Sequence, residues 1–184
     1  MTDISTQWYR IEAHFEKAGL TDTLHDGASP DDIAQLERDL NLTLPTDLRD
    51  SLLRHNGSDE GAWPYGGLLD VKGIKSETDI WRGLLDDGTF GDRADHDASI
   101  RPGMTQTGWW HHGWVPLDAD GGGNGHVVDT APGENGSLGQ VLFMDHEVGP
   151  TGPQFGSTVE YLQEIADRLD SGKLRWENEI WEEY

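Results

Sequence analysis

Short apolar runs separated by glycine-rich turns dominate the stretch from Trp109 to Glu147. The first run covers residues 114–117, the second 126–128 and the third 140–144, and Gly, Pro, Asn or Asp bounds each of them. Residues 118–125 contain three consecutive glycines and an Asn-Gly pair, which favour a hairpin because glycine adopts positive φ without steric cost. Pro-Gly and Asn-Gly pairs also precede the third run. The pattern predicts a three-stranded antiparallel meander.

Apolar residues recur at helical spacing in five other parts of the chain. The expected helices cover residues 5–18, 29–40, 46–55, 76–85 and 157–171. Local signals support their ends: Ser29 is an N-cap followed by proline, and Gly19 and Gly172 are C-caps. Ser157 and Glu160 have the spacing of a capping box. Helices flanking a meander predict an α+β fold.

The remaining segments carry weaker patterns. Leu68–Val71 is short and apolar enough for a strand, and Ser76 is placed to cap the helix that follows it. Residues 86–106 are rich in Asp and Gly and predict a long surface loop, and residues 148–156 predict a Pro/Gly loop. The expected organisation is one domain over residues 1–172 and an acidic, tryptophan-containing tail over 173–184. That tail either docks on the domain or seeks a partner.

Composition narrows the class of partner. The chain has 184 residues, with 13 Lys and Arg against 35 Asp and Glu, so its formal net charge is -22. Such a charge disfavours nucleic acid and membrane surfaces and favours basic proteins, although acidic surfaces also serve solubility. The chain has no cysteine, which excludes disulfides and thiolate metal ligands. Neither a signal peptide nor a membrane-length apolar run is visible, so we expect a cytoplasmic protein.

The order of these pieces resembles the SUKH superfamily, and most closely its Knr/Smi-like branch. The resemblance covers residues 29–169, and the conjunction and order of the motifs carry it. The structural positions that match the family motif are Pro45, Leu48, Asn56, Gly57, Trp114, Pro116, Gly139, Gln140 and His146. Asp118, Gly123 and Asp129 match as well. The chain departs from the family at Asn124 and Glu147, where aspartate is common.

The resemblance implies a curved antiparallel sheet flanked by helices and a function in binding. The branch contains bacterial immunity proteins, which neutralise a cognate toxin, and yeast regulators of cell wall assembly. We therefore hypothesise an immunity protein that blocks a toxin by direct binding. The net charge favours a toxin domain of basic character, such as a nuclease. The alternative is a scaffold or regulator that coordinates cell wall assembly and cell proliferation through protein contacts.

The acidic turn and the histidines invite metal or catalytic interpretations. Asp118, Asp120 and Asn124, with Asp129 nearby, resemble a calcium loop, but the spacing fails the EF-hand pattern. Asx side chains that stabilise a turn explain them better. The four histidines at 111, 112, 126 and 146 lack the spacing of a metal site or a catalytic pair. We therefore expect no catalytic residue, no metal and no cofactor, and a protein that is not an enzyme.

The tryptophans provide the candidate contact surface. Trp109 and Trp110 are adjacent, so both cannot face inward if they lie on a strand. One of the pair, framed by acidic residues, is typical of an anchor for a basic partner. The predicted partner-binding residues are Trp109, Trp110, Asp118, Asp120 and Asp129.

Overall fold

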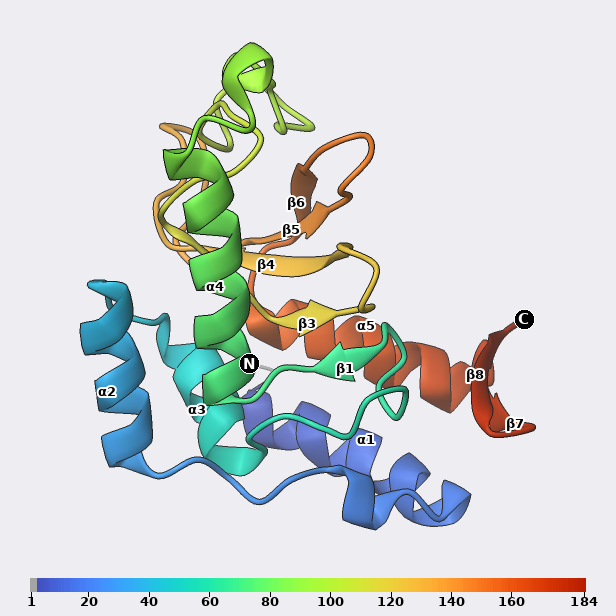
Figure 1. Cartoon of the computed structure of the whole chain (residues 1–184). Coiled ribbons are helices and arrows are strands. Elements are labelled where there is room, and N and C mark those ends of the chain that lie inside the picture. Colours follow the sequence, from blue (N-terminus) through green and yellow to red (C-terminus); the bar gives the residue numbers. More distant parts are fainter. Residues whose placement is uncertain (1–2) are drawn as a thin grey trace.

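The computed structural model describes residues 3–184, which form an α+β fold (Figure 1). The α-helices are α1 (Ile4–Ala18), α2 (Pro30–Leu40), α3 (Thr46–Arg54), α4 (Val71–Asp86) and α5 (Thr158–Ser171). The strands are β1 (Gly67–Leu68), β2 (Trp114–Pro116), β3 (Asp118–Ala119), β4 (Gly125–Asp129), β5 (Val141–Met144), β6 (Thr151–Phe155), β7 (Leu174–Glu177) and β8 (Ile180–Glu183). Two 3-10 turns are also present: η1 (Thr21–Thr23) lies between α1 and α2, and η2 (Gly91–Arg93) lies between α4 and β2.

The main sheet confirms the predicted meander and extends it by one strand. Its order is β2-β4-β5-β6, and each neighbouring pair is antiparallel. The loop expected at 148–156 is wrong in part, because β6 pairs with β5 there. Its sequence contains Gly-Pro, which argues against a central strand but is tolerated at a sheet edge. Pairing with an existing edge, rather than side-chain alternation, makes this segment a strand.

Helix ends follow the local capping signals. Gly19 ends α1 with a φ of 73°, and the Ser29 side chain accepts a hydrogen bond from the Asp32 backbone N–H at the start of α2. The Ser157 hydroxyl caps α5 by accepting from the Glu160 N–H at 3.2 Å. The Glu160 carboxylate accepts from the N–H of Gly156, one residue before the position that a capping box requires.

The start of α4 differs from the prediction. Leu68–Val71 is not a strand of four residues, since β1 ends at Leu68 and the helix begins at Val71. Asp70, not Ser76, is the N-cap, and its side chain accepts from the Gly73 N–H at 2.6 Å. The Asn56 side chain accepts from the Val71 N–H at 2.9 Å. The adjacent Asp70 and the more distant Asn56 therefore satisfy free N–H groups in the first turn of α4, which allows the helix to begin earlier than predicted.

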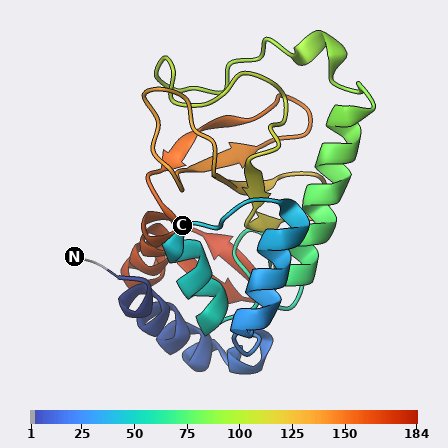
Figure 2. The same cartoon turned by 90° about the vertical axis from the view of Figure 1, so that its left-hand side faces the viewer.

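The two faces of the sheet carry separate hydrophobic clusters. On β4, Val128 faces the cluster built with α1, α3 and α5, whereas Val127 faces the opposite cluster. The second cluster contains Trp109, Trp110 and Phe90. Residues 86–113, predicted largely as a surface loop, run over this second face (Figure 2) and bury Phe90 there. Both faces of the sheet are covered, which strand periodicity alone does not show.

The C-terminal tail docks on the domain. β7 and β8 form an antiparallel hairpin beside α5 (Figure 1). The Trp181 indole N–H donates to the Ala62 carbonyl at 2.8 Å, and its ring lies 5.4 Å from that of Phe15. Of the two alternatives left open by the sequence, the structure shows the docked one.

One ionic cluster predicts a pH-dependent contribution to stability. Arg54 donates two hydrogen bonds to Glu12, both at 2.7 Å, and His55 lies 2.8 Å from the same carboxylate. The hydrogen bonds from Arg54, aided by His55, lower the pKa of Glu12 below its ordinary value although burial opposes them. The ionised carboxylate is therefore favoured by folding, and this stabilisation is present above about pH 4.5 and is lost as the pH falls further.

We expect Glu12→Gln to lower the free energy of unfolding by about 1 kcal/mol at pH 7, a modest value because water screens this partly exposed pair. The difference from the wild type should shrink as the pH falls below about 4.5, and it should close once the pH has passed through the lowered pKa of the native carboxylate. Urea unfolding of the wild type and the variant at several pH values measures this difference in the free energy of unfolding. Glu16→Gln, on the same helix but exposed, is the matched control and should change little. A pH-independent difference would contradict the assignment.

Candidate functional site

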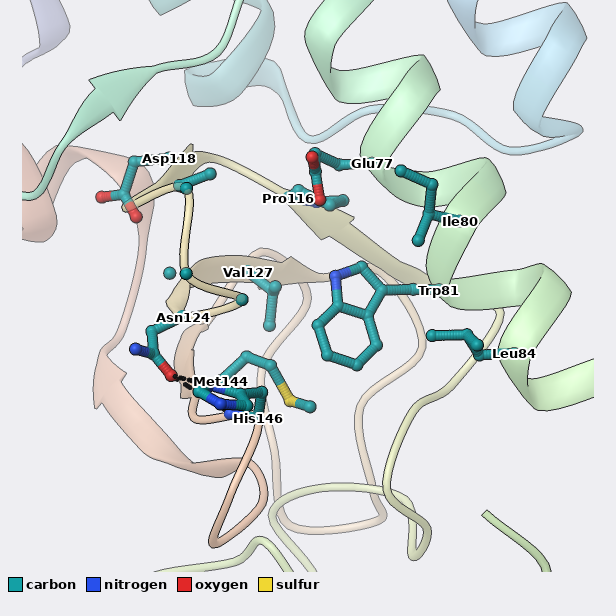
Figure 3. Close-up of a pocket in the computed structure, with 15 residues that line it drawn as sticks. Glu77, Ile80, Trp81, Leu84, Pro116, Asp118, Asn124, Val127, Met144 and His146 are labelled. Atoms are coloured by element: carbon teal, nitrogen blue, oxygen red, sulfur yellow. Dashed lines mark hydrogen bonds between the residues drawn. The ribbon is translucent and has the colours of Figure 1, made fainter. Parts of the chain in front are cut away.

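An open groove of about 350 Å³ lies between α4 and the turn that joins β3 to β4 (Figure 3). One wall is a single face of α4, and the floor comes from β2, β4 and β5. The residues of α4 in the wall are Glu77, Ile80, Trp81 and Leu84. The apolar side chains of the floor are Pro116, Val127 and Met144, and the polar rim includes Asn124 and His146. The groove is thus apolar below and polar at the edge, as binding sites commonly are.

The helix presents this wall because its other apolar side is already used. Ile74 and Thr78, four residues apart, are fully buried on the adjoining side of the helix. Trp81 stacks on Trp110, with 4.9 Å between ring centroids and 13° between planes. Ile80, one position earlier, remains 53% exposed. The helical repeat therefore places one aromatic anchor and one exposed aliphatic side chain along the same groove.

Hydrogen bonds hold the polar rim. The Asp120 carboxylate accepts from the Gly122 N–H at 2.7 Å and from both the backbone and side-chain N–H groups of Asn124, at 2.9 and 2.7 Å. Burial raises the pKa of Asp120, but these hydrogen bonds outweigh it, so the pKa is lowered overall. Asn124 in turn accepts from the His146 backbone N–H and lies 3.0 Å from its Nδ1. The acidic turn is an Asx turn with its oxygens occupied.

Below the groove, Asp118 is the centre of a buried network. Its Oδ1 accepts from the His126 backbone N–H at 2.6 Å. Its Oδ2 accepts from the Tyr161 hydroxyl at 2.5 Å and lies 2.8 Å from His126 Nδ1. Trp63 Nε1 donates to the same tyrosine oxygen at 2.7 Å. Burial, followed by the negative charge of Asp118, raises the pKa of Tyr161 well above its ordinary value. The network joins the sheet to α5 and stabilises the floor of the site.

Asp129, at the end of β4, supports the neighbouring loops. Its carboxylate is fully buried and accepts from the Ala131 N–H and from Gln140 Nε2, each at 2.9 Å. Burial raises the pKa of Asp129, and the two hydrogen bonds oppose this shift. Gln140 Nε2 also donates to the Met104 carbonyl at 2.7 Å, which ties residues 86–113 to the sheet.

The expectation that Trp109 or Trp110 faces solvent is wrong. Both are buried, because residues 108–113 form irregular backbone in which adjacent side chains need not alternate. Trp110 packs on Trp81, and the Trp109 ring lies 5.2 Å from that of His96. Asp118 and Asp129 are buried as well, so Asp120 alone of the five predicted partner-binding residues is exposed. The other four are enclosed by the fold, and the assignment of these residues to partner binding stays a prediction.

Sequence reasoning missed the α4 wall of the groove. The signal was present: Ile80 and Leu84 lie four residues apart on the face that includes Glu77, while Lys75 and Asp79 pair on another side. A stripe of this kind ordinarily faces a core, which is the interpretation that the pattern favours. Only the tertiary structure shows that α4 stands partly clear of the sheet there.

The remaining motif residues join the helices to the sheet. Pro45 packs on Gly139, where an added Cβ would lie 3.2 Å from the proline Cβ. At Gly57, with a φ of 86°, an added Cβ would lie 2.6 Å from the Asp70 nitrogen. Leu48 and Trp114 are fully buried, and Pro116 and His146 border the groove. The motif therefore maintains packing and shapes the rim of the site.

Membrane-spanning helices and metal clusters are both missing from residues 3–184. No helix in this range has both the length and the apolar character needed to cross a bilayer. Across the same range, no three His, Asp or Glu side chains gather in a geometry that could hold a metal ion.

Comparison with known proteins gives a consistent set of relatives. Residues 27–169 match the family described as the SMI1 / KNR4 family (SUKH-1). The chain is 33% identical over 185 residues to a cell wall biosynthesis/cell cycle regulator of Schizosaccharomyces pombe, covering 92% of this chain and 37% of that protein. It is 30% identical over 210 residues to a glucan synthesis regulatory protein of Neurospora crassa, covering 94% and 39%. It is 24% identical over 188 residues to a cell wall assembly regulator of Saccharomyces cerevisiae, covering 83% and 37%. The chain spans less than two fifths of the length of these relatives.

Proposed function

The chain belongs to the SMI1/KNR4 family (SUKH-1), and from this membership we propose that it is a non-enzymatic regulatory domain that acts by binding other proteins. The observation that carries the proposal is the similarity, over more than nine tenths of this chain, to proteins named as cell wall and glucan synthesis regulators.

This support favours the regulator over the toxin-immunity hypothesis. None of these three relatives is named for immunity or for a toxin, and each is named a regulator. We therefore place the regulator first. A role in coordinating cell wall synthesis fits a domain that contacts several proteins rather than one toxin.

The groove supports binding rather than turnover. Asp118, Asn124 and His146 at the groove, and Asp120 at the adjoining turn, are held by hydrogen bonds within the domain. A general base or nucleophile needs a reactive atom directed at the substrate, whereas these groups are engaged in maintaining the fold. The exception is Glu77, and among residues 3–184 no group is hydrogen-bonded to it that could act with it as a catalytic pair. The apolar wall of α4 remains available for contact.

Affinity capture tests the function. We expect the purified full chain to retain several proteins of cell wall synthesis or signalling from a lysate of its source organism, identified by mass spectrometry. Retention should decrease at high salt, because the bait is strongly acidic. An unrelated acidic domain of similar charge is the control bait. One basic toxin domain retained stoichiometrically would instead establish immunity, and retention equal to the control would contradict the binding function.

A further inference from the structure

The groove exposes apolar surface beside a rigid rim. Ile80 projects from α4 beside the half-buried Trp81 and Leu84, over a floor of buried apolar side chains (Figure 3). The volume of the groove, about 350 Å³, is near the lower end of the range for ligand pockets, so the groove suits a few side chains of a partner rather than a large cofactor. Covering such surface removes apolar area from water and favours association.

Two polar groups in the groove have no partner in the part of the chain that the structure describes. The Glu77 carboxylate is half-buried on the α4 wall, and burial raises its pKa with no hydrogen bond or cation to oppose the shift. The Trp81 indole nitrogen lies on the side of the groove where Glu77 and Pro116 lie (Figure 3). It too makes no hydrogen bond with any of residues 3–184. The α4 wall therefore carries one acceptor and one donor that are free to bind a partner.

Nearby cations are already engaged elsewhere. Lys75 pairs with Asp79, and Arg82 donates to the carbonyls of Leu40 and His112. The other titratable groups that border the groove are Asp118 and His146, with Asp120 at the adjoining turn, and all three are held by internal hydrogen bonds. Glu77 is thus the uncompensated charge of the groove, and its natural complement is a cation brought by the partner.

We propose that this groove binds a short segment of a basic protein partner, in which an apolar side chain packs against Ile80 and Trp81 while an adjacent Lys or Arg pairs with Glu77. The inference rests on the proposed protein-binding function and names its site. A second copy of this chain fits poorly, since each copy carries a net charge of -22. The same charge opposes a nucleic acid or an anionic membrane.

Peptide selection tests the proposed chemistry while the partner itself is still unidentified. A random 12-residue peptide library displayed on phage is selected on the immobilised full-length wild-type chain. Peptides that bind should carry Lys or Arg within two positions of a large apolar residue. Failure to enrich any peptide, or enrichment of acidic peptides, would overturn the proposal.

Variants then locate the binding. Fluorescence anisotropy with one synthesised peptide should show affinity about 10-fold weaker for Glu77→Gln, because a partly desolvated charge pair is lost, and weaker still for Glu77→Lys. Ile80→Asp should also weaken binding about 10-fold or more. Asp79→Asn removes the same charge from another side of α4, and Ile100→Asp alters an equally exposed isoleucine away from the groove; both should stay within about twofold of wild type. Equal effects of Glu77→Gln and Asp79→Asn would overturn the proposal.

One comparison separates failure of the site from failure of the function. Affinity capture is repeated with the Glu77→Lys, Ile80→Asp double variant, whose fold is checked by circular dichroism. Loss of the proteins that the wild type captures supports the groove. Undiminished capture would overturn the groove and leave the binding function intact. Absence of capture by the wild type, with peptides still dependent on Glu77, would instead reject the regulatory function alone.

Discussion

Asp118→Ala is expected to lower the free energy of unfolding by about 4 kcal/mol, because it removes the acceptor for three buried donors. The residue is 2% exposed, so water cannot replace its carboxylate without opening the structure. The Tyr161 hydroxyl and the His126 backbone N–H would lose their acceptor, and the His126 ring would lose its buried partner. Urea or guanidinium unfolding at pH 7, followed by far-UV circular dichroism, measures the loss.

Asp118→Asn keeps the shape and distinguishes lost hydrogen bonds from lost packing. An amide oxygen can still accept from the His126 N–H, but its NH₂ group cannot accept the Tyr161 proton. We expect a loss of about 2 kcal/mol, smaller than that of the alanine variant. Asp95→Ala, at an exposed position, is the control and should change stability by less than about 0.5 kcal/mol. If Asp118→Ala cost no more than this control, the network would not stabilise the fold.

Trp63→Ala is the second large expected effect, with a loss of about 4 kcal/mol. Trp63 is 1% exposed and lies among the rings of Trp8, Phe15 and Tyr161, at centroid distances of 5.6, 6.1 and 6.5 Å. It connects α1 to α5 and to the Asp118 network. Truncation leaves a cavity between elements that are far apart in the sequence, and rigid helices cannot collapse fully to fill it.

Trp63→Phe retains an aromatic ring but removes the indole N–H that donates to Tyr161. We expect an intermediate loss of about 2 kcal/mol, from lost volume and a lost hydrogen bond. Tyr9→Ala, an aromatic residue that is 63% exposed, should cost less than about 1 kcal/mol. Equilibrium denaturation followed by far-UV circular dichroism compares the three. Equal losses for Trp63→Ala and Tyr9→Ala would refute the central position of Trp63.

In a double-mutant cycle, Trp63→Phe and Tyr161→Phe should be non-additive, because each removes the same hydrogen bond. Additive losses would show that the two side chains contribute independently. The cycle thereby tests whether the network acts as one unit, which individual substitutions cannot do.

Some of the family-motif residues pack in the core, and others border the groove. Leu48 and Trp114 are buried, whereas Pro116 and His146 border the groove. The order and spacing of the motif positions along the chain suffice to identify the family, because those positions make the contacts between helices and sheet. They do not indicate which surface is exposed to solvent, since exposure depends on which other segments of the chain pack over that surface.

The sequence by itself determined the elements whose signals are local. Strand runs bounded by glycine predicted β2, β4 and β5, and caps such as Ser29 and Gly172 predicted helix ends, because these interactions join residues within a few positions. The α+β class follows from those elements. The Asx turn around Asp120 was predictable for the same reason.

Only the tertiary structure decided what depends on distant partners. Asn56 helps α4 to begin at Val71, the β5 edge makes residues 151–155 a strand, and residues 86–113 bury both Trp109 and Trp110. The groove exists because α4 presents Glu77 and Ile80 to a turn that lies some forty residues further along the chain. Local sequence determines which conformations each segment prefers. Burial, charge compensation and exposure are properties of the assembled surfaces, and they were settled only when those segments packed together.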